Sequence, residues 1–145
     1  MTIIFSATTC RLTISARGGF SNCTTTPFRH AWIGTAKEDL LAFTNGVVRE
    51  IGHALYIAQI GGKHASAKPL KGFGGGTVLE IVENFDGDTY RAVYTVRFAE
   101  AIYVLHAFQK KSKKGIKTPQ REMDKVESRL QRAQQEHAAW QKTKQ

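Results

Sequence analysis

Residues 77–97 read TVLEIVENFDGDTYRAVYTVR and predict a β-hairpin. Two runs rich in valine, isoleucine, threonine and tyrosine flank the dipeptide Asp86-Gly87, and Asp-Gly between two such runs is a strong hairpin signal. Side chains alternate between the two faces of a strand, so Tyr90 and Arg91 are expected on opposite faces of the sheet. The fold is therefore expected to contain a sheet built around this antiparallel strand pair.

Two more strands are predicted on either side of the hairpin in the chain, FRHAWIG at 28–34 and AIYVLHAFQ at 101–109. Alternation in the later strand is expected to bring the following side chains to one face: Ile102, Val104, His106, Phe108 and Lys110. If Arg91 points to the open face of the sheet, it lies within reach of the basic end of this strand.

Three helices are predicted around these strands. AKEDLLAF (36–43) and VVREIGHALYIAQI (47–60) repeat apolar residues at helical spacing and form a helical hairpin. Residues 61–76 (GGKHASAKPLKGFGGG), with six glycines and a proline, are expected to be a loop. A C-terminal helix is predicted to start with Thr118 as N-cap and Pro119 as its first residue.

The element order predicts an α+β fold, β-α-α-β-β-β, with a small antiparallel sheet, a helical hairpin on one face and a C-terminal helix. The other face of the sheet is expected to be open. Residues 27–117 form the expected domain, and 118–145 the C-terminal helix with a basic tail. Residues 1–26 are expected to be a disordered leader, an added edge strand or the product of a start site placed too far upstream.

Charge is concentrated at one end of this 145-residue chain, whose formal net charge is +9. Residues 103–145 carry eleven basic and four acidic side chains, among them five lysines between positions 110 and 117. A basic patch beside a folded core indicates a polyanionic partner, and the alternative is a solvated tail that keeps the protein soluble.

Composition also excludes several classes of protein. No apolar run approaches the ~20 residues that a membrane span needs, and the N-terminus lacks the features of a secretory signal, so a soluble cytoplasmic protein is expected. Cys10 and Cys23 are expected to be free thiols, although a disulfide between them stays open. The histidines show no ligand spacing, so no metal or other cofactor is expected.

Four segments together resemble the RelE/ParE toxin superfamily: the helical hairpin, KPLKGFG (68–74), TYRAVY (89–94) and VLHAFQKKSKKGIKTP (104–119). The resemblance covers about residues 27–135 and points to the phage-derived HigB-like branch of type II toxin–antitoxin systems. It implies a ribosome-dependent endoribonuclease that cuts mRNA. It also implies a small neutralising antitoxin, often a helix-turn-helix protein.

The resemblance further implies a metal-free reaction, in which the ribose 2′-OH attacks the adjacent phosphate. Arg91 matches the family's arginine in the third-strand motif, and Lys110 or Lys111 matches its basic residue at the last strand's exit. A guanidinium backed by ammonium groups suits a phosphodiester and its pentacoordinate transition state.

The chain departs from the family pattern at two places. The basic pair of the second strand is replaced by Glu80 and Val82, and no tyrosine follows the lysine cluster. Glu80 is therefore a candidate general base and His106 a candidate acid or base. The alternatives are that Glu80 forms a structural ion pair with Lys68, Lys71 or Arg91, and that His106 is a hydrogen-bonded core histidine.

Further lysines are predicted to bind RNA or to raise the rate of encounter with the ribosome: Lys68, Lys71, Lys113, Lys114 and Lys117. Three functions fit the resemblance. The first is an mRNA interferase, which the lysine-rich exit of the last strand favours. The second is a ParE-like toxin that inhibits DNA gyrase, and the third is a member that binds RNA or its antitoxin without catalysis.

Overall fold

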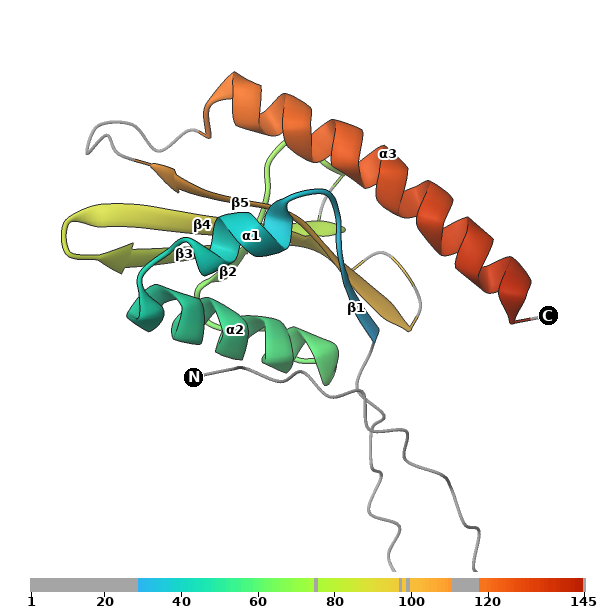
Figure 1. Cartoon of the computed structure of the whole chain (residues 1–145), viewed down its shortest axis with the longest axis horizontal. Coiled ribbons are helices and arrows are strands. Elements are labelled where there is room, and N and C mark those ends of the chain that lie inside the picture. The colour runs from blue at the N-terminus through green and yellow to red at the C-terminus, as the bar shows by residue number, and fades with distance from the viewer. Residues whose placement is uncertain (1–28, 75, 97, 99, 111–117, 145) are drawn as a thin grey trace, which may run out of the picture.

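The computed structural model describes residues 29–74, 76–96, 98, 100–110 and 118–144. The predicted leader and four lysines of the basic cluster (Lys111, Lys113, Lys114 and Lys117) lie outside these residues. The elements follow in the order β1 (Arg29–Trp32), α1 (Ala36–Leu41), α2 (Asn45–Gln59), β2 (Ala67–Pro69), β3 (Val78–Phe85), β4 (Asp88–Thr95), β5 (Ala101–Lys110) and α3 (Gln120–Thr143). This confirms the predicted α+β class (Figure 1).

The strands form one five-stranded sheet in the order β1-β5-β4-β3-β2. The predicted antiparallel pairing is confirmed for β3, β4 and β5 and also holds for β2, whereas β1 departs from it and pairs with β5 in parallel. The chain starts at this edge with β1 and returns beside it only at β5, after α1, α2 and the other three strands. The sheet is therefore mixed.

The hairpin of β3 and β4 is confirmed together with its turn. Phe85 pairs with Asp88, and the two residues between them, Asp86 and Gly87, have φ angles of 50° and 81°. Positive φ at both central residues is typical of a type I′ turn, whose twist matches that of the flanking strands. The turn thereby fixes the register of the whole pair.

Two predicted boundaries change. The segment predicted as a loop contains β2, whose Lys68 pairs with Glu80 at the edge of the sheet. Pro69 ends this strand, a position that an edge strand tolerates because no ladder hydrogen bond is lost there. At α3 the N-cap is Pro119 rather than Thr118, so the helix begins one residue later than predicted.

Helices cover both faces of the sheet, so the prediction of an open face is wrong. Buried residues of α1 and α2 pack with Tyr90, Ala92 and Tyr94 on one side. On the other side Val126 and Ala133 of α3 are buried in a second cluster that includes Val93 of β4. Figure 1 shows α3 across the sheet from α2. The sequence shows that α3 has an apolar stripe, but it does not show which face of the sheet this stripe covers.

A β-bulge in β5 overturns the prediction that alternate residues from Ile102 to Lys110 share one face. Tyr94 pairs with Val104 and Val93 pairs with His106, so Leu105 is the extra residue on β5. An extra residue reverses the alternation beyond it. Val104 therefore packs on the side of α1 and α2, whereas Phe108 packs on the side of α3.

Tyr94 carries a polar group into the core. It is fully buried, and within the described part of the chain its hydroxyl has no hydrogen-bond partner. Burial raises the pKa of this hydroxyl to about 12. Because an unpaired buried hydroxyl costs stability, Tyr94→Phe is expected to raise the free energy of unfolding by about 1 kcal/mol, as measured by urea denaturation. Tyr56→Phe on the exposed side of α2 is the control, and a marked loss of stability in Tyr94→Phe would contradict the expectation.

No helix among the described residues is both long enough and apolar enough to cross a membrane.

Candidate functional site

The first polar centre on the α3 face of the sheet is an ion pair between Glu80 of β3 and Arg91 of β4. Arg91 Nη1 lies 2.6 Å from Glu80 Oε2, and the two side chains are 8% and 14% exposed. Arg91 Nη1 also donates a longer hydrogen bond of 3.4 Å to Thr118 Oγ1. Glu80 thus forms an ion pair with Arg91, which the sequence had offered as one alternative to a catalytic role. The pair is largely shielded from water.

Lysines stand on both sides of this ion pair. Lys68 is exposed and pairs directly with Glu80, so the two side chains share a face. Lys110 ends β5 opposite Thr89, which shares the face of Arg91. Lys71 is exposed just beyond β2. The structure therefore places Lys68 and Lys110 on the sheet face of the ion pair, whereas Lys71 follows Lys68 by three residues.

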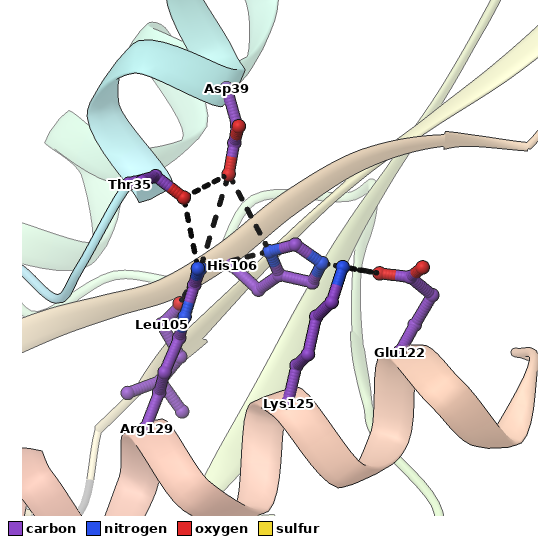
Figure 2. Close-up of polar contacts among 7 residues, drawn as sticks. All are labelled: Thr35, Asp39, Leu105, His106, Glu122, Lys125 and Arg129. Carbon is purple, nitrogen blue, oxygen red and sulfur yellow. Dashed lines mark hydrogen bonds and ion pairs between the residues drawn. The ribbon is translucent and has the colours of Figure 1, made fainter.

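His106 belongs to a second polar centre (Figure 2). Its ring is only 3% exposed and stacks on Phe108 at 5.3 Å. The ring Nε2 is hydrogen-bonded to a carboxylate oxygen of Glu122, and Nδ1 lies 3.0 Å from Arg129 Nη1. Because a guanidinium can only donate, Nδ1 accepts, and the proton of the neutral ring is on Nε2. Both ring nitrogens are therefore engaged by α3.

Arg129 connects this centre to the edge of the sheet. β1 ends at Trp32, and beyond this point no strand among the described residues lies beside the backbone of β5 on that edge. Arg129 Nη1 donates to the carbonyl oxygen of Leu105 at 3.0 Å and so satisfies that edge. Its Nη2 donates to Thr35 Oγ1 at 2.9 Å, and the Thr35 hydroxyl donates to Asp39 at 2.8 Å. The His106 network thus ties α1, β5 and α3 together.

Opposing effects act on the two titratable groups at its centre. Burial lowers the pKa of His106, and the hydrogen bond to Glu122 opposes this only in part. Burial alone raises the pKa of the Glu122 carboxyl, but the hydrogen bond and charge of His106 and the charge of Lys125 outweigh it and hold that pKa below its usual value. The geometry and the pKa directions favour a neutral His106 beside an ionised Glu122.

The family described as phage derived protein Gp49-like (DUF891) matches residues 38–131. The matched region begins in α1, ends in α3 and includes both polar centres except Thr35. The chain belongs to the Gp49-like family. This is a family of RelE-like toxins, which confirms the coarser part of the resemblance, whereas the HigB-like branch stays a prediction. A comparison with curated proteins found no match.

The two polar centres of the Gp49-like domain lie on one face but do not touch each other. Glu80, Val93 and His106 are successive cross-strand neighbours in one row, so Val93 separates the two candidate acid–base groups. In the next row Arg91 is opposite Phe108. The structure therefore brings Glu80 and Arg91 together and places His106 apart from them.

Sequence reasoning missed most of the His106 network. Glu122, Lys125 and Arg129 recur at helical spacing and so face one side of α3, which was the available signal. Their partner on β5 was not visible, because it depends on the bulge and on the face that α3 covers. Within the described residues no group of three or more histidine, cysteine or acidic side chains is placed to hold a metal.

Proposed function

We propose that this Gp49-like protein is the toxin of a type II toxin–antitoxin system and acts as a ribosome-dependent mRNA endoribonuclease. The observation that carries the proposal is the Glu80–Arg91 ion pair on a sheet face that also bears Lys68 and Lys110. A carboxylate held by a guanidinium supplies a proton acceptor and a phosphate ligand at one place.

In the proposed reaction Arg91 binds the non-bridging oxygens of the scissile phosphate. Glu80 accepts the proton of the ribose 2′-OH, whose oxygen attacks the adjacent phosphorus. The bond from phosphorus to the 5′ oxygen breaks, which leaves a 2′,3′-cyclic phosphate, and the 5′ oxygen takes a proton. The ammonium of Lys110 is the candidate donor, and it also compensates the charge that develops on the phosphate.

Access to this pair is expected from the side of β2. Arg91 itself is buried, whereas Glu80 is partly exposed and its cross-strand neighbour Lys68 is open to solvent. A phosphate that approaches over Lys68 meets the Glu80 carboxylate first. It then replaces this carboxylate as the partner of the Arg91 guanidinium. Lys68 and Lys71 would guide the polyanion to this edge.

His106 has a positioning role in this proposal rather than a role as general acid. Both of its ring nitrogens are bound by α3, so neither is presented to a substrate. It holds the first half of α3 against the sheet, next to Thr118, whose hydroxyl contacts Arg91.

The partners follow from the same proposal. A ribosome is a large polyanion, and a formal net charge of +9 favours fast encounter with it at low salt. The ribosome and mRNA imply action in the cytoplasm, and a cognate antitoxin, expected to be a helix-turn-helix protein, would neutralise the toxin. The domain is proposed to extend from residue 27 to 117, with α3 docked on it.

The proposal is tested by primer extension on a defined mRNA in a cell-free translation reaction, with and without ribosomes. Discrete cuts that need ribosomes and end in a 2′,3′-cyclic phosphate are the expected result. Intact mRNA together with growth arrest in cells would overturn it. A supercoiling assay with DNA gyrase would then test the ParE-like alternative.

A further inference from the structure

A groove lies between α3 and the segment that follows β2, with Gly72 and Phe73 on one side and the helix on the other. It is open to solvent and has a volume of about 500 Å³, within the range of small-ligand sites. Its helical wall extends from Gln120 to Gln134, which at 1.5 Å per residue is a length of about 21 Å. No residue of either polar centre lines it.

The groove has an apolar floor and an amide-rich rim. Phe73, Met123 and Leu130 line it and are only partly buried where they pack on the core cluster under α3. Glu127 and Gln131 stand on the rim, both exposed, and neither has a hydrogen-bond or ion-pair partner within the described part of the chain. An aromatic face beside unengaged amide and carboxylate groups is suited to the faces and edges of nucleobases.

The groove lies close in the chain to a basic residue and to a contact of the proposed catalytic pair. Lys71 precedes Gly72, which lines the groove, and Gln120 is two residues beyond Thr118, the residue that contacts Arg91. Lys71 therefore offers a positive charge beside the wall that Gly72 and Phe73 form, while the helical wall offers amide and carboxylate groups for bases. This division is the usual one between contacts that position a nucleic acid and contacts that read it.

We propose that this groove binds the nucleotides of single-stranded RNA that flank the scissile phosphate, and that Gln131 and Glu127 contribute to the choice of sequence. Phe73 would stack on a base, Gln131 and Glu127 would hydrogen-bond to base edges, and Lys71 would contact a phosphate. The inference rests on the proposed function, because it assigns a subsite to the same RNA substrate.

The test is fluorescence anisotropy of labelled single-stranded RNA decamers that differ at one base, with the full chain and without ribosomes. Gln131→Ala and Glu127→Gln are expected to change the ratio of affinities between decamers by about tenfold, the effect of one lost base contact. Lys71→Ala is expected to weaken binding of all decamers alike and to reduce the salt slope by about 0.7. Gln135→Ala, exposed on α3 but outside the groove, is the matched control.

Unchanged affinities and ratios in Gln131→Ala and Glu127→Gln would overturn the inference. Loss of binding to a partner protein in these variants, with RNA binding intact, would also overturn it and assign the groove to that protein. The outcome is separable from that of the proposed function, because binding is measured without cleavage. If Gln131→Ala and Glu127→Gln cleave mRNA at the same sites and rates as the wild type, the groove has no role in substrate choice. The proposed catalytic role of Glu80 and Arg91 would not be affected.

Discussion

Replacing Glu80 with glutamine is expected to slow mRNA cleavage by about 10²–10⁴-fold, the usual contribution of a general base. Glutamine keeps the size and shape of the side chain but cannot take up the 2′-OH proton. The measurement is the rate of cleavage at one site by primer extension in a translation reaction. Glu83→Gln is the matched control, because Glu83 lies on the same strand but alternation directs its side chain to the opposite face.

The same substitution separates the two roles that Glu80 has been given. If the carboxylate is only a structural partner, Glu80→Gln removes a charge-assisted hydrogen bond from a largely buried Arg91. The free energy of unfolding should then fall by about 1.5–3 kcal/mol, and activity should fall only in proportion to the folded fraction. If Glu80 is also the general base, the folded Glu80→Gln protein should cleave mRNA more slowly than the folded wild type.

Urea denaturation of Glu80→Gln gives the folded fraction at the temperature of the assay, to which the cleavage rate is normalised. Wild-type cleavage per folded molecule would contradict a catalytic Glu80 and leave it as an ion-pair partner. Arg91→Ala should also be inactive, but it leaves a carboxylate without its guanidinium, so its interpretation needs the same correction for folding.

The Glu80–Arg91 pair was within reach of sequence reasoning. Once Asp86-Gly87 is taken as a two-residue turn, Phe85 must oppose Asp88, and counting back sets Val82 against Arg91. Glu80 then lies one step along the same face, diagonal to the guanidinium and close enough for long side chains to meet. Local turn chemistry therefore determines this contact between two strands.

The His106 centre was not predictable in the same way. It depends on the extra residue at Leu105, which reverses the alternation of β5, and no proline or glycine marks that bulge in the sequence. It also depends on the face of the sheet that α3 covers. Met123, Val126 and Leu130 predict a helix with one apolar side, but a periodic stripe carries no information about which surface will bury it.

Lowering the pH below about 6.5 is expected to reduce the free energy of unfolding and to loosen α3 first. Burial holds the folded-state pKa of His106 below the ordinary value of 6.5, so the unfolded chain takes up a proton before the folded one does. Stability from the neutral imidazole is complete above pH 6.5 and is lost as the pH falls toward the folded-state pKa. The loss is at most about 1.4 kcal/mol per pH unit for each such histidine.

Charged groups from two helices surround the ring of His106. Asp39 faces it from α1, and three groups face it from α3: Glu122, Lys125 and Arg129. A protonated ring would turn an N–H toward Arg129, which itself can only donate, so this contact is lost on protonation. Glu122, whose folded-state pKa lies below 4.5, adds a second loss of stability only below about pH 4.5.

The measurement is urea denaturation at pH values from 7.5 to 5, together with hydrogen exchange of the amides of α3. His106→Gln is expected to remove part of the pH dependence, and His30→Gln is the matched control, since burial also lowers the pKa of His30 but this residue lies on β1 away from α3. Only the His106 variant should abolish the loss of protection of the α3 amides at low pH, where protection is the intrinsic exchange rate at each pH divided by the measured rate.

If His106→Gln folds poorly, Glu122→Gln gives an independent test that keeps the imidazole. The hydrogen bond and charge of Glu122 raise the pKa of His106 against the effect of burial. Glutamine keeps an acceptor oxygen but lacks the negative charge, so this variant should lower that pKa further. The acid-sensitive window would then extend to lower pH, and the free energy of unfolding at neutral pH would fall by about 1.5–3 kcal/mol. A pH dependence identical to that of wild type in both variants would show that His106 binds its proton equally in the folded and unfolded chains, and would remove it as the group that couples α3 to pH.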